Sequence, residues 1–474
     1  MLAGGSPAWP EHQSGRRVKD MTGDTSEPLL RPARRRFKPY PAYKDSGVEW
    51  LGQLPSHWSL RKWRYCCHVT QGQVPPDDDR YRDRIMIAPN HIESGTGRIL
   101  FTETADEQGA TSGKYMVKPG DIIYSKIRPA LNKACIATGH WLCSADMYPV
   151  AISTADLTPK YLLYFILSGP FVRLMVDESM RVAMPKVNRE TVSDCPLLIP
   201  PLEEQESIVR LLDRETARID GLVAKKERLI ELLQEKRAAL ITRAVTKGLD
   251  PSAPMKDSGV EWLGQIPAHW EVKRLRDIAA SLQTGPFGSQ LHAAEYVSGG
   301  CPVINPVNLR DGCLIPDWNC TVDEHTASRL ERHTLLAGDI IFARRGELGR
   351  CGLVTSHQDG WICGTGSLRL RPLPELSRPE FLLHSLSTRG VGEWLELQSV
   401  GATMLNLNGS IIGRIPIGFP PMNEQEEIVS RVSNEIHRSD TLVAKVREAI
   451  GRLKELRTAL ISAAVTGKID VRAA

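Results

Sequence analysis

Side chains that could support catalysis are present in this sequence, but not with the spacing that catalysis requires. There is no G-x-x-x-x-G-K-[ST] loop for a nucleotide phosphate and no G-x-G-x-x-G turn for a dinucleotide. Asn305-Pro306-Val307-Asn308 is nearest to the Asn-Pro-Pro-aromatic signature of amino-methyltransferases, but lacks the second proline and the aromatic residue. Glu271-Val272-Lys273 matches half of a nuclease-like pattern, with no Pro-Asp suitably placed before it. We therefore expect no catalytic residue in this chain.

Cysteine and histidine do not form a metal-binding pattern either. The ten cysteines include no C-x-x-C pair, and no H-E-x-x-H is present, so we expect reduced, mostly buried thiols and no metal site. The dipeptides His57-Trp58 and His269-Trp270 occur at repeated positions. We interpret them as tryptophans that pack against helices rather than as a site.

Basic and amide side chains near predicted strands remain, and their chemistry is that of DNA binding. Arginine and lysine bind phosphates and read guanine, whereas asparagine and glutamine read adenine. One set follows the two Gly-Asp-Ile-Ile sequences: Lys126, Arg128, Asn132, Lys133, Arg344, Arg345 and Arg350. A second set precedes each predicted long helix: Arg181, Lys186, Asn188, Arg189, Thr403, Asn406 and Asn408. A third lies in early glycine-rich loops: Gln71, Gln73, Thr284, Ser289 and Gln290. Each set alone also fits a solvated loop, but their parallel occurrence favours DNA contact.

An internal repeat organises the elements that must position these residues. Residues 44–58 and 256–270 match at 13 of 15 positions, and residues 201–250 and 421–470 match at 24 of 50. The intervening blocks diverge almost completely, except for Gly-Asp-Ile-Ile at 120–123 and 338–341. Constant ends with variable middles indicate a fixed frame that carries two different binding blocks.

The constant segments 201–250 and 421–474 predict long helices. Paired prolines precede each one, and Gly248 and Gly467 mark the ends. An apolar heptad stripe includes Ile208, Leu212, Leu222, Leu229, Leu233 and Leu240 in the first helix and Ile428, Val432, Leu442, Val446, Leu453, Leu456 and Leu460 in the second. Each helix could pack on its own block alone, but stripes of this length favour an antiparallel coiled coil between the two.

The variable blocks predict short strands punctuated by glycine and proline, each followed by a short helix. Expected strands lie near 85–88, 121–124, 134–137, 149–152, 302–304, 339–342, 352–354 and 367–370, and expected helices near 159–168 and 379–387. The fold class is therefore α+β: two α/β blocks in pseudo-twofold tandem, 44–200 and 251–420, joined by the two long helices.

Composition is that of an ordinary globular protein. The 474 residues are 41% hydrophobic and 24% charged, with no membrane-length apolar run and no secretory signal, so we expect a cytoplasmic protein. The formal charge of +4 comes entirely from residues 1–43, which we interpret as a disordered basic, proline-rich extension. Net charge therefore does not indicate nucleic-acid binding, and local clusters must carry that argument.

These motifs resemble the specificity subunit (HsdS) of type I restriction-modification systems. The resemblance rests on KDSGVEWLG with its following HW, on the P-x-x-E-Q helix entry, and on the ALI…AVTGKID ending. It covers residues 44–470. GDIIYSKIRPALNKA, and GPFGSQL with PVINPVNL and GDIIFARRGELGR, look like two different subtypes of target-recognition domain.

The resemblance implies a division of labour. Residues 44–200 and 251–420 would be target-recognition domains that each read half of a bipartite, asymmetric double-stranded DNA site, and the helices would be the spacer. Two methyltransferase subunits would bring S-adenosylmethionine and methylate adenine at N6, and restriction subunits would use ATP and Mg²⁺, in a bacterial or archaeal cytoplasm. This chain would bind no cofactor. A coiled-coil adaptor that binds only proteins, and a self-contained DNA enzyme, are the alternatives.

Overall fold

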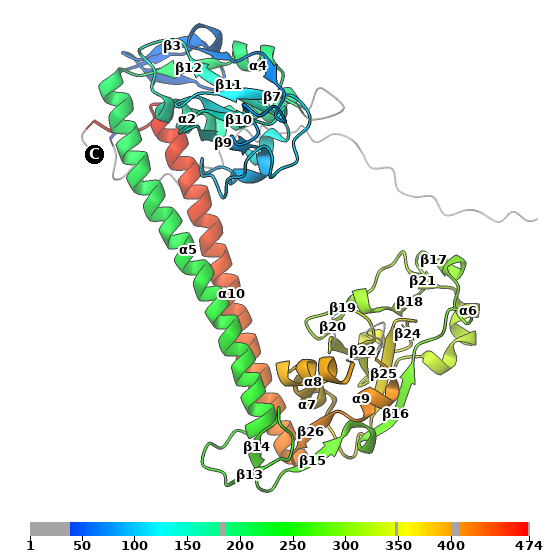
Figure 1. The fold of residues 1–474 in the computed structure, drawn as a ribbon. Coiled ribbons are helices and arrows are strands. Elements are labelled where there is room, and N and C mark those ends of the chain that lie inside the picture. The colour runs from blue at the N-terminus through cyan, green and yellow to red at the C-terminus, as the bar shows by residue number, and fades with distance from the viewer. Residues whose placement is uncertain (1–37, 180–185, 347–348, 400–406, 473–474) are drawn as a thin grey trace, which may run out of the picture. The chain divides into compact units, whose positions relative to one another are not determined.

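The computed structural model describes residues 38–179, 186–346, 349–399 and 407–472 (Figure 1). They form two compact units: unit 1 contains the chain up to Lys226 together with the segment from Arg447 onward, and unit 2 is Glu227–Val446. The long helices α5 (Leu202–Lys247) and α10 (Met422–Val465) each continue from one unit into the other. Among the described helices, none is both long and apolar enough to span a membrane.

Unit 1 is built on two four-stranded sheets and two short strand pairs. One sheet has the order β4-β11-β8-β9 and is antiparallel throughout: Cys67–Val69, Met147–Ile152, Ile122–Ser125 and Ala134–Ile136. The other has the order β5-β7-β10-β6: Gln73–Val74, Lys114–Val117, Trp141–Cys143 and Met86–Ile87. The strand pairs are β1 with β2 and β3 with β12: Tyr43–Asp45, Gln53–Pro55, Ser59–Lys62 and Pro196–Ile199. Three helices complete the block: α2 (Pro159–Leu167), α3 (Gly169–Ser179) and α4 (Arg189–Asp194).

Unit 2 repeats this plan although the block sequences differ. Its principal sheet, β16-β25-β22-β23, is formed by Ala279–Thr284, Ser367–Pro372, Ile340–Ala343 and Cys351–Leu353. A second sheet, β17-β21-β18-β24, is formed by Tyr296–Val297, Thr321–Val322, Cys301–Ile304 and Ile362–Cys363. The strand pairs β13-β14, β15-β26 and β19-β20 are Met255–Asp257 with Gln265–Pro267, Glu271–Arg274 with Pro416–Phe419, and Leu309–Arg310 with Cys313–Leu314. The short helices are α6 (Glu324–Arg329), α7 (Pro379–Leu386), α8 (Arg389–Ser399) and α9 (Gly409–Gly413). The predicted strands and helices of both blocks are thereby confirmed.

The shared Gly-Asp-Ile-Ile sequence is the turn that starts the same strand in each sheet. Gly120 and Gly338 have φ of +89° and +92°, values that favour glycine. The following aspartates accept a hydrogen bond from a backbone amide three residues earlier, at 2.9 Å for Asp121 and 2.8 Å for Asp339. The sequence echo is therefore structural rather than part of a binding site.

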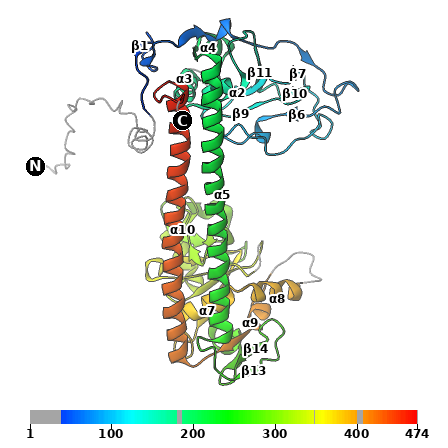
Figure 2. The ribbon, with the colours of Figure 1, turned by 90° about the vertical axis from the view of Figure 1, so that its left-hand side faces the viewer.

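The two long helices pair antiparallel, as predicted (Figure 2). In unit 1, Arg457 of α10 donates to Asp220 of α5 at 3.0 Å. In unit 2, Arg237 of α5 donates to Asp440 of α10 at 2.7 Å. The residue number rises from 220 to 237 along α5 while it falls from 457 to 440 along α10, which fixes the direction. The alternative in which each helix packs only on its own block is excluded.

The buried stripe departs from the predicted heptad by one residue along each helix. Ile208, Leu212, Ile428, Val432 and Leu460 are buried as predicted, and Leu233, Val446, Leu453 and Leu456 are half-buried. The prediction is wrong for four leucines that are 38–43% exposed: Leu222, Leu229, Leu240 and Leu442. The next residue takes the inward position instead: Val223, Ile230, Ile241 and Val443. A helix with little supercoil keeps a period of 3.6, so a strict seven-residue repeat drifts by ~20° per heptad.

Each long helix begins with a glutamate held by the repeated His-Trp dipeptide. Glu204 accepts from Trp58 Nε1 at 3.1 Å and lies 2.8 Å from His57 Nε2. Glu424 has the same neighbours, with Trp270 Nε1 at 3.0 Å and His269 Nε2 at 2.8 Å. Both indoles are fully buried, which confirms the predicted packing. A carboxylate in the first turn also interacts favourably with the helix dipole.

The glutamine that follows links each helix to its variable block. Gln205 Oε1 accepts from the backbone amide of Thr158, at the start of α2, at 3.0 Å. Gln425 Oε1 accepts from the amide of Arg378, at the start of α7, at 2.9 Å. The Glu-Gln pair is therefore the joint between frame and block in both units.

Part of the predicted disordered extension is ordered. Tyr40 is buried, packs on Trp58 and donates a hydrogen bond to Glu204, and Tyr43 begins β1. Residues 1–37 lie outside the described residues. The ordered frame thus starts a few residues before the first repeat, because an aromatic side chain completes the glutamate site.

Candidate nucleic-acid interface

The predicted DNA-binding loops of unit 1 lie together at one end of the strands of the β4-β11-β8-β9 sheet, which we call the edge of this sheet. The register places Ser125, the last residue of β8, opposite Met147, the first of β11, and Tyr124 opposite Ala134, the first of β9. Strand β4 is antiparallel to β11, so it ends toward the same edge. The exposed Gln71 and Gln73, and the loop 126–133, therefore leave the sheet on one side.

The second predicted set joins the first at this edge. The amide of Val187 donates to the carbonyl of Lys126 at 2.8 Å, and Ile127 forms a β-bridge with Lys186. Lys126 Nζ lies 5.4 Å from the centre of the Tyr148 ring, and the Arg189 guanidinium lies 5.8 Å from it. Two segments about sixty residues apart in the sequence thus bring Lys126, Lys186 and Arg189 together in one cationic surface.

Positive charges outweigh the nearby negative charge at this surface. Burial lowers the pKa of Lys126, and the neighbouring Lys186 and Arg189 lower it further, while Asp146 opposes them. Among the described residues, no ion pair joins Lys126, Lys186 or Arg189 to a carboxylate. A cluster of cations that repel one another is stabilised by an anion such as phosphate.

Within the loop, the candidate residues have different roles. Arg128 and Asn132 have φ of 47° and 43°, a left-handed conformation rare for residues other than glycine. Arg128 is exposed, whereas Asn132 is buried and Lys133 donates to the carbonyl of Pro89 at 2.6 Å. Lys133 therefore supports the loop from within, Asn132 is buried with an amide oxygen that has no hydrogen-bond partner in the residues that the structure describes, and Arg128 is the side chain that the loop presents.

The equivalent edge of unit 2 has the same construction. Strand β16 ends at Thr284, opposite Leu368, and β22 ends at Ala343, opposite Ser367. The amide of Leu407 donates to the carbonyl of Arg344 at 3.0 Å, which repeats the bond between Val187 and Lys126. Burial and then the adjacent Arg345 lower the pKa of Arg344. Arg345 is exposed, and no carboxylate pairs with either arginine in the described part of the chain.

Three glycines allow the loops of this edge to meet. A Cβ at Gly285 would lie 1.8 Å from the carbonyl oxygen of Gly364, one at Gly364 would lie 2.3 Å from Asn305 Oδ1, and one at Gly366 would lie 2.9 Å from Pro306. The amide of Gly285 donates to Ser367, and that of Arg344 donates to Gly366, both at 3.0 Å. The glycine-rich loop after β16 and the arginines after β22 therefore share one surface.

Two residues at this edge were missed by the sequence analysis. Phe287 and Val307 are 61% and 65% exposed, and each lies in one of the loops that meet there. Their signal was an apolar side chain between glycines or prolines, in GPFG and NPVN. Exposed aromatic and aliphatic side chains next to arginines suit contact with bases.

The remaining candidates are placed as follows. Ser289 and Gln290 are exposed, and Gln290 Oε1 accepts from the amide of Phe287 at 3.0 Å, so that side chain shapes its own loop. Asn408 Oδ1 accepts from the amide of Ile411 at 3.0 Å and caps α9, whereas Asn188 precedes α4 without such a bond. Arg350 is half-buried. Arg181, Thr403 and Asn406 lie outside the described residues. Within the described ranges, no group of three or more metal-ligating side chains is found.

Comparison with known proteins agrees with this architecture. The type I restriction modification DNA specificity domain matches residues 60–232 and 267–451. The EcoDI specificity subunit of Escherichia coli is 27% identical over 287 residues, which are 60% of this chain and 59% of that protein. A protein of Methanocaldococcus jannaschii with the name "Putative type I restriction enzyme MjaX specificity subunit" is 21% identical over 444 residues, which are 89% of this chain and 96% of that one.

Among solved structures, a chain from work on complex assembly and conformational transition of the type I R-M system has the same fold. It aligns with a TM-score of 0.66 at 19% identity and covers 87% of this chain and 98% of its own length. The family match includes both variable blocks and most of both long helices. The chain therefore belongs to the family of type I restriction modification DNA specificity domains.

Proposed function

We propose that this chain is the DNA-recognition subunit of a type I restriction-modification complex, and that each unit reads one half of a bipartite DNA site. The observation that carries the proposal is the repetition of one cationic edge in two blocks of unrelated sequence. In both, a basic residue follows the strand β8 or β22 and accepts the same backbone hydrogen bond. Phosphate contacts at such edges supply affinity, and neighbouring side chains read bases.

The two half-sites are unlike. The edge of unit 1 presents Lys186 and Arg128, whereas that of unit 2 presents Arg345, Phe287 and Val307. Side chains of different size and hydrogen-bonding capacity select different base edges. The proposal therefore includes an asymmetric target.

The helix pair is the spacer in this proposal. A continuous helix of 46 residues such as α5 is about 69 Å long. Paired along a buried stripe, two such helices resist bending better than a loop does. An adenine must leave the base stack to enter a methyltransferase pocket, and a rigid spacer keeps the flanking DNA in register while it does.

Partner subunits carry the chemistry in this proposal: methyltransferase subunits that use S-adenosylmethionine to methylate adenine at N6, and restriction subunits that use ATP and Mg²⁺. We infer that a partner docks on unit 2, where α5 and α10 border a cavity of about 500 Å³. Its lining includes the apolar Leu240 and Leu442, the acidic Glu435 and the basic Lys236, Arg243, Arg431 and Arg438. Arg237 also lines it, but its guanidinium is already bonded to Asp440. A partner helix with an acidic border would bury these leucines. No observation favours an adaptor that binds proteins alone.

The test is methylome sequencing of cells that express the complex with single substitutions in this chain. Arg345→Ala should relax recognition in one half of the site, and Arg128→Ala should relax it in the other, because each removes an exposed arginine from one edge only. We expect a loss of discrimination of about tenfold in the affected half.

Matched controls remove an arginine from the opposite end of each sheet. Arg276 precedes β16 and Arg64 precedes β4, and both side chains are about half exposed. Arg276→Ala and Arg64→Ala should leave both halves unchanged. Equal effects of the edge and control substitutions would contradict the assignment of the interface.

A further inference from the structure

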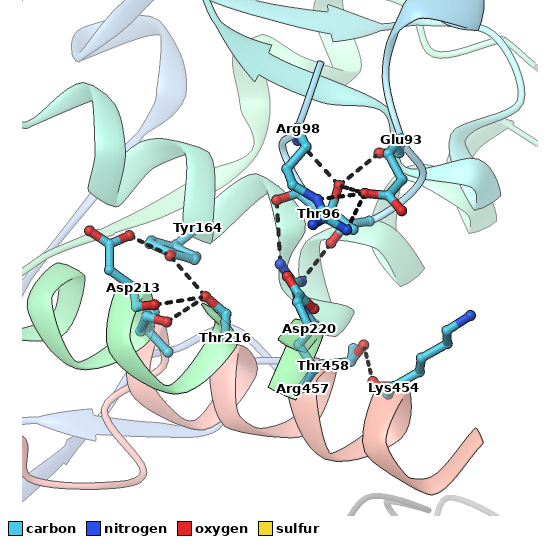
Figure 3. Close-up of polar contacts among 12 residues, drawn as sticks. Glu93, Thr96, Arg98, Tyr164, Asp213, Thr216, Asp220, Lys454, Arg457 and Thr458 are labelled. Atoms are coloured by element: carbon cyan, nitrogen blue, oxygen red, sulfur yellow. Dashed lines mark hydrogen bonds and ion pairs between the residues drawn. The ribbon is translucent and has the colours of Figure 1, made fainter. Parts of the chain in front are cut away.

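A buried arginine of α10 contacts both the helix pair and the block in unit 1 (Figure 3). The Arg457 side chain is 9% exposed. Its Nε donates to Asp220 of α5 at 3.0 Å, and its Nη1 and Nη2 donate to the carbonyl oxygens of Gly95 and Thr96 at 2.8 and 3.4 Å. A guanidinium has a planar, fixed set of donors, so these contacts define the position of the 93–98 loop on the helices.

The 93–98 loop is itself held in one shape. Arg98 Nε donates to Glu93 at 2.7 Å, and Thr96 Oγ1 donates to the same carboxylate at 2.9 Å. Gly97 has φ of +81°, and a Cβ there would lie 3.1 Å from Leu163 of α2. These contacts hold the loop in one conformation, so we expect the loop to move as a unit if its contact with Arg457 changes.

The same loop supports the 126–133 loop, which carries the candidate DNA-binding residues. The amide of Gly95 donates to the carbonyl of Asn132 at 3.0 Å, and Ser94 Oγ donates to the carbonyl of Leu131. Gly95 thus accepts from α10 through its carbonyl and donates to the 126–133 loop through its amide. Arg128 and Asn132 hold left-handed conformations, which persist only where the surroundings impose them.

We propose that Arg457 is a positioning residue for DNA reading by unit 1. Through the 93–98 loop it fixes the 126–133 loop on the helix pair, so the presentation of Arg128 to DNA depends on a side chain that does not touch DNA. This inference rests on the proposed function. It assigns to a residue of the constant helix a role in sequence discrimination by the variable block.

Two readouts test it, one with DNA and one without. In the first, the assembled methylating complex acts on a plasmid library in which each half-site is randomised, with wild-type chain, Arg457→Ala and Arg237→Ala. Arg237 occupies the equivalent position in unit 2, where it bonds to Asp440. We expect Arg457→Ala to lower discrimination about tenfold in the half read by unit 1 and to leave the other half unchanged. Arg237→Ala should change neither half.

In the second readout, hydrogen exchange is measured on the DNA-free chain. Arg457→Ala should speed exchange of the amides in the 93–98 and 126–133 loops, because it removes the contacts that oppose local opening of these loops. Exchange in β8 and β11 should speed as well, because the variant is less stable. A role in global stability alone would speed exchange in the strands and leave the 126–133 loop unchanged, and that result would overturn the proposal.

A milder variant covers the case in which Arg457→Ala does not fold. Ser94 is exposed, so Ser94→Ala should fold and remove only the bond to Leu131. We expect it to cost discrimination about threefold in the same half, and no change there would overturn the proposal. If the wild-type complex shows no sequence-dependent methylation, the proposed function fails, and the exchange experiment still decides whether the two loops are coupled.

Discussion

The same arginine–aspartate pair occurs once in each unit, and its surroundings give it different roles. Arg457 and Asp220 in unit 1 have side chains that are 9% and 19% exposed, whereas Arg237 and Asp440 in unit 2 are 35% and 58% exposed. The exposed pair has the shorter bond, 2.7 Å against 3.0 Å. Water screens the charges of the exposed pair, whereas the buried arginine would be left without compensation if its partners were lost. Burial rather than distance therefore decides how much each pair contributes to stability. Both constant helices carry the arginine–aspartate pair, and contact with a variable block determines whether the arginine is buried.

The largest effect is expected from removing the buried arginine. Arg457→Ala should lower the free energy of unfolding of unit 1 by about 3 kcal/mol, because Asp220 and two carbonyl oxygens lose their donor. Arg237→Ala should cost about 0.5 kcal/mol or less. Urea denaturation of the two variants measures the difference. Equal losses of stability would show that burial does not distinguish the two arginine–aspartate pairs.

A smaller effect, alike in both units, is expected at the helix starts. Glu204→Ala and Glu424→Ala each leave a buried indole N–H without its acceptor, which should cost about 2 kcal/mol. Glu204 also accepts from Tyr40, so its replacement should cost more. Calorimetry on both variants checks this order. A negligible loss for either one would show that the His-Trp-Glu joint is not a stabilising element.

The smallest effect tests the period of the helix seam. Val223 is 9% exposed and Leu222 is 40% exposed. Val223→Ala should therefore destabilise the free chain by about 1 kcal/mol, and Leu222→Ala by about half of that or less, although leucine is the larger residue. Thermal denaturation of the chain without partners makes this measurement. The reverse order would show that Leu222 rather than Val223 lies in the interface between the helices, as the strict heptad predicted.

The repeat, the helix ends and most strands were predictable from sequence because each has a local signal. Gly248 and Gly467 follow the last turns with φ of +71° and +68°, and the glycine at each end was sufficient to place them. The drift from Leu222 to Val223 was not predictable, since it depends on how little the helices supercoil.

The sequence predicted which loops carry the candidate residues, but not how each side chain is placed within its loop. The loops after β8 and β22 meet the segments before α4 and α9, a contact that the sequence did not predict. Asn132 and Lys133 have the residue types of DNA-binding side chains, yet Asn132 is buried and Lys133 donates to the carbonyl of Pro89. Arg457 gave no signal at all, because its acceptors in the block are backbone carbonyls that no side chain in the sequence reveals.

The account depends on each unit reading its own half of the site, and an exchange of blocks tests this most directly. Residues 59–200 would be replaced by the corresponding block of another specificity subunit, with both long helices retained, and the methylome of the host would be sequenced. The account predicts a new sequence in one half, with the other half and the gap between them unchanged. A change in both halves would contradict it.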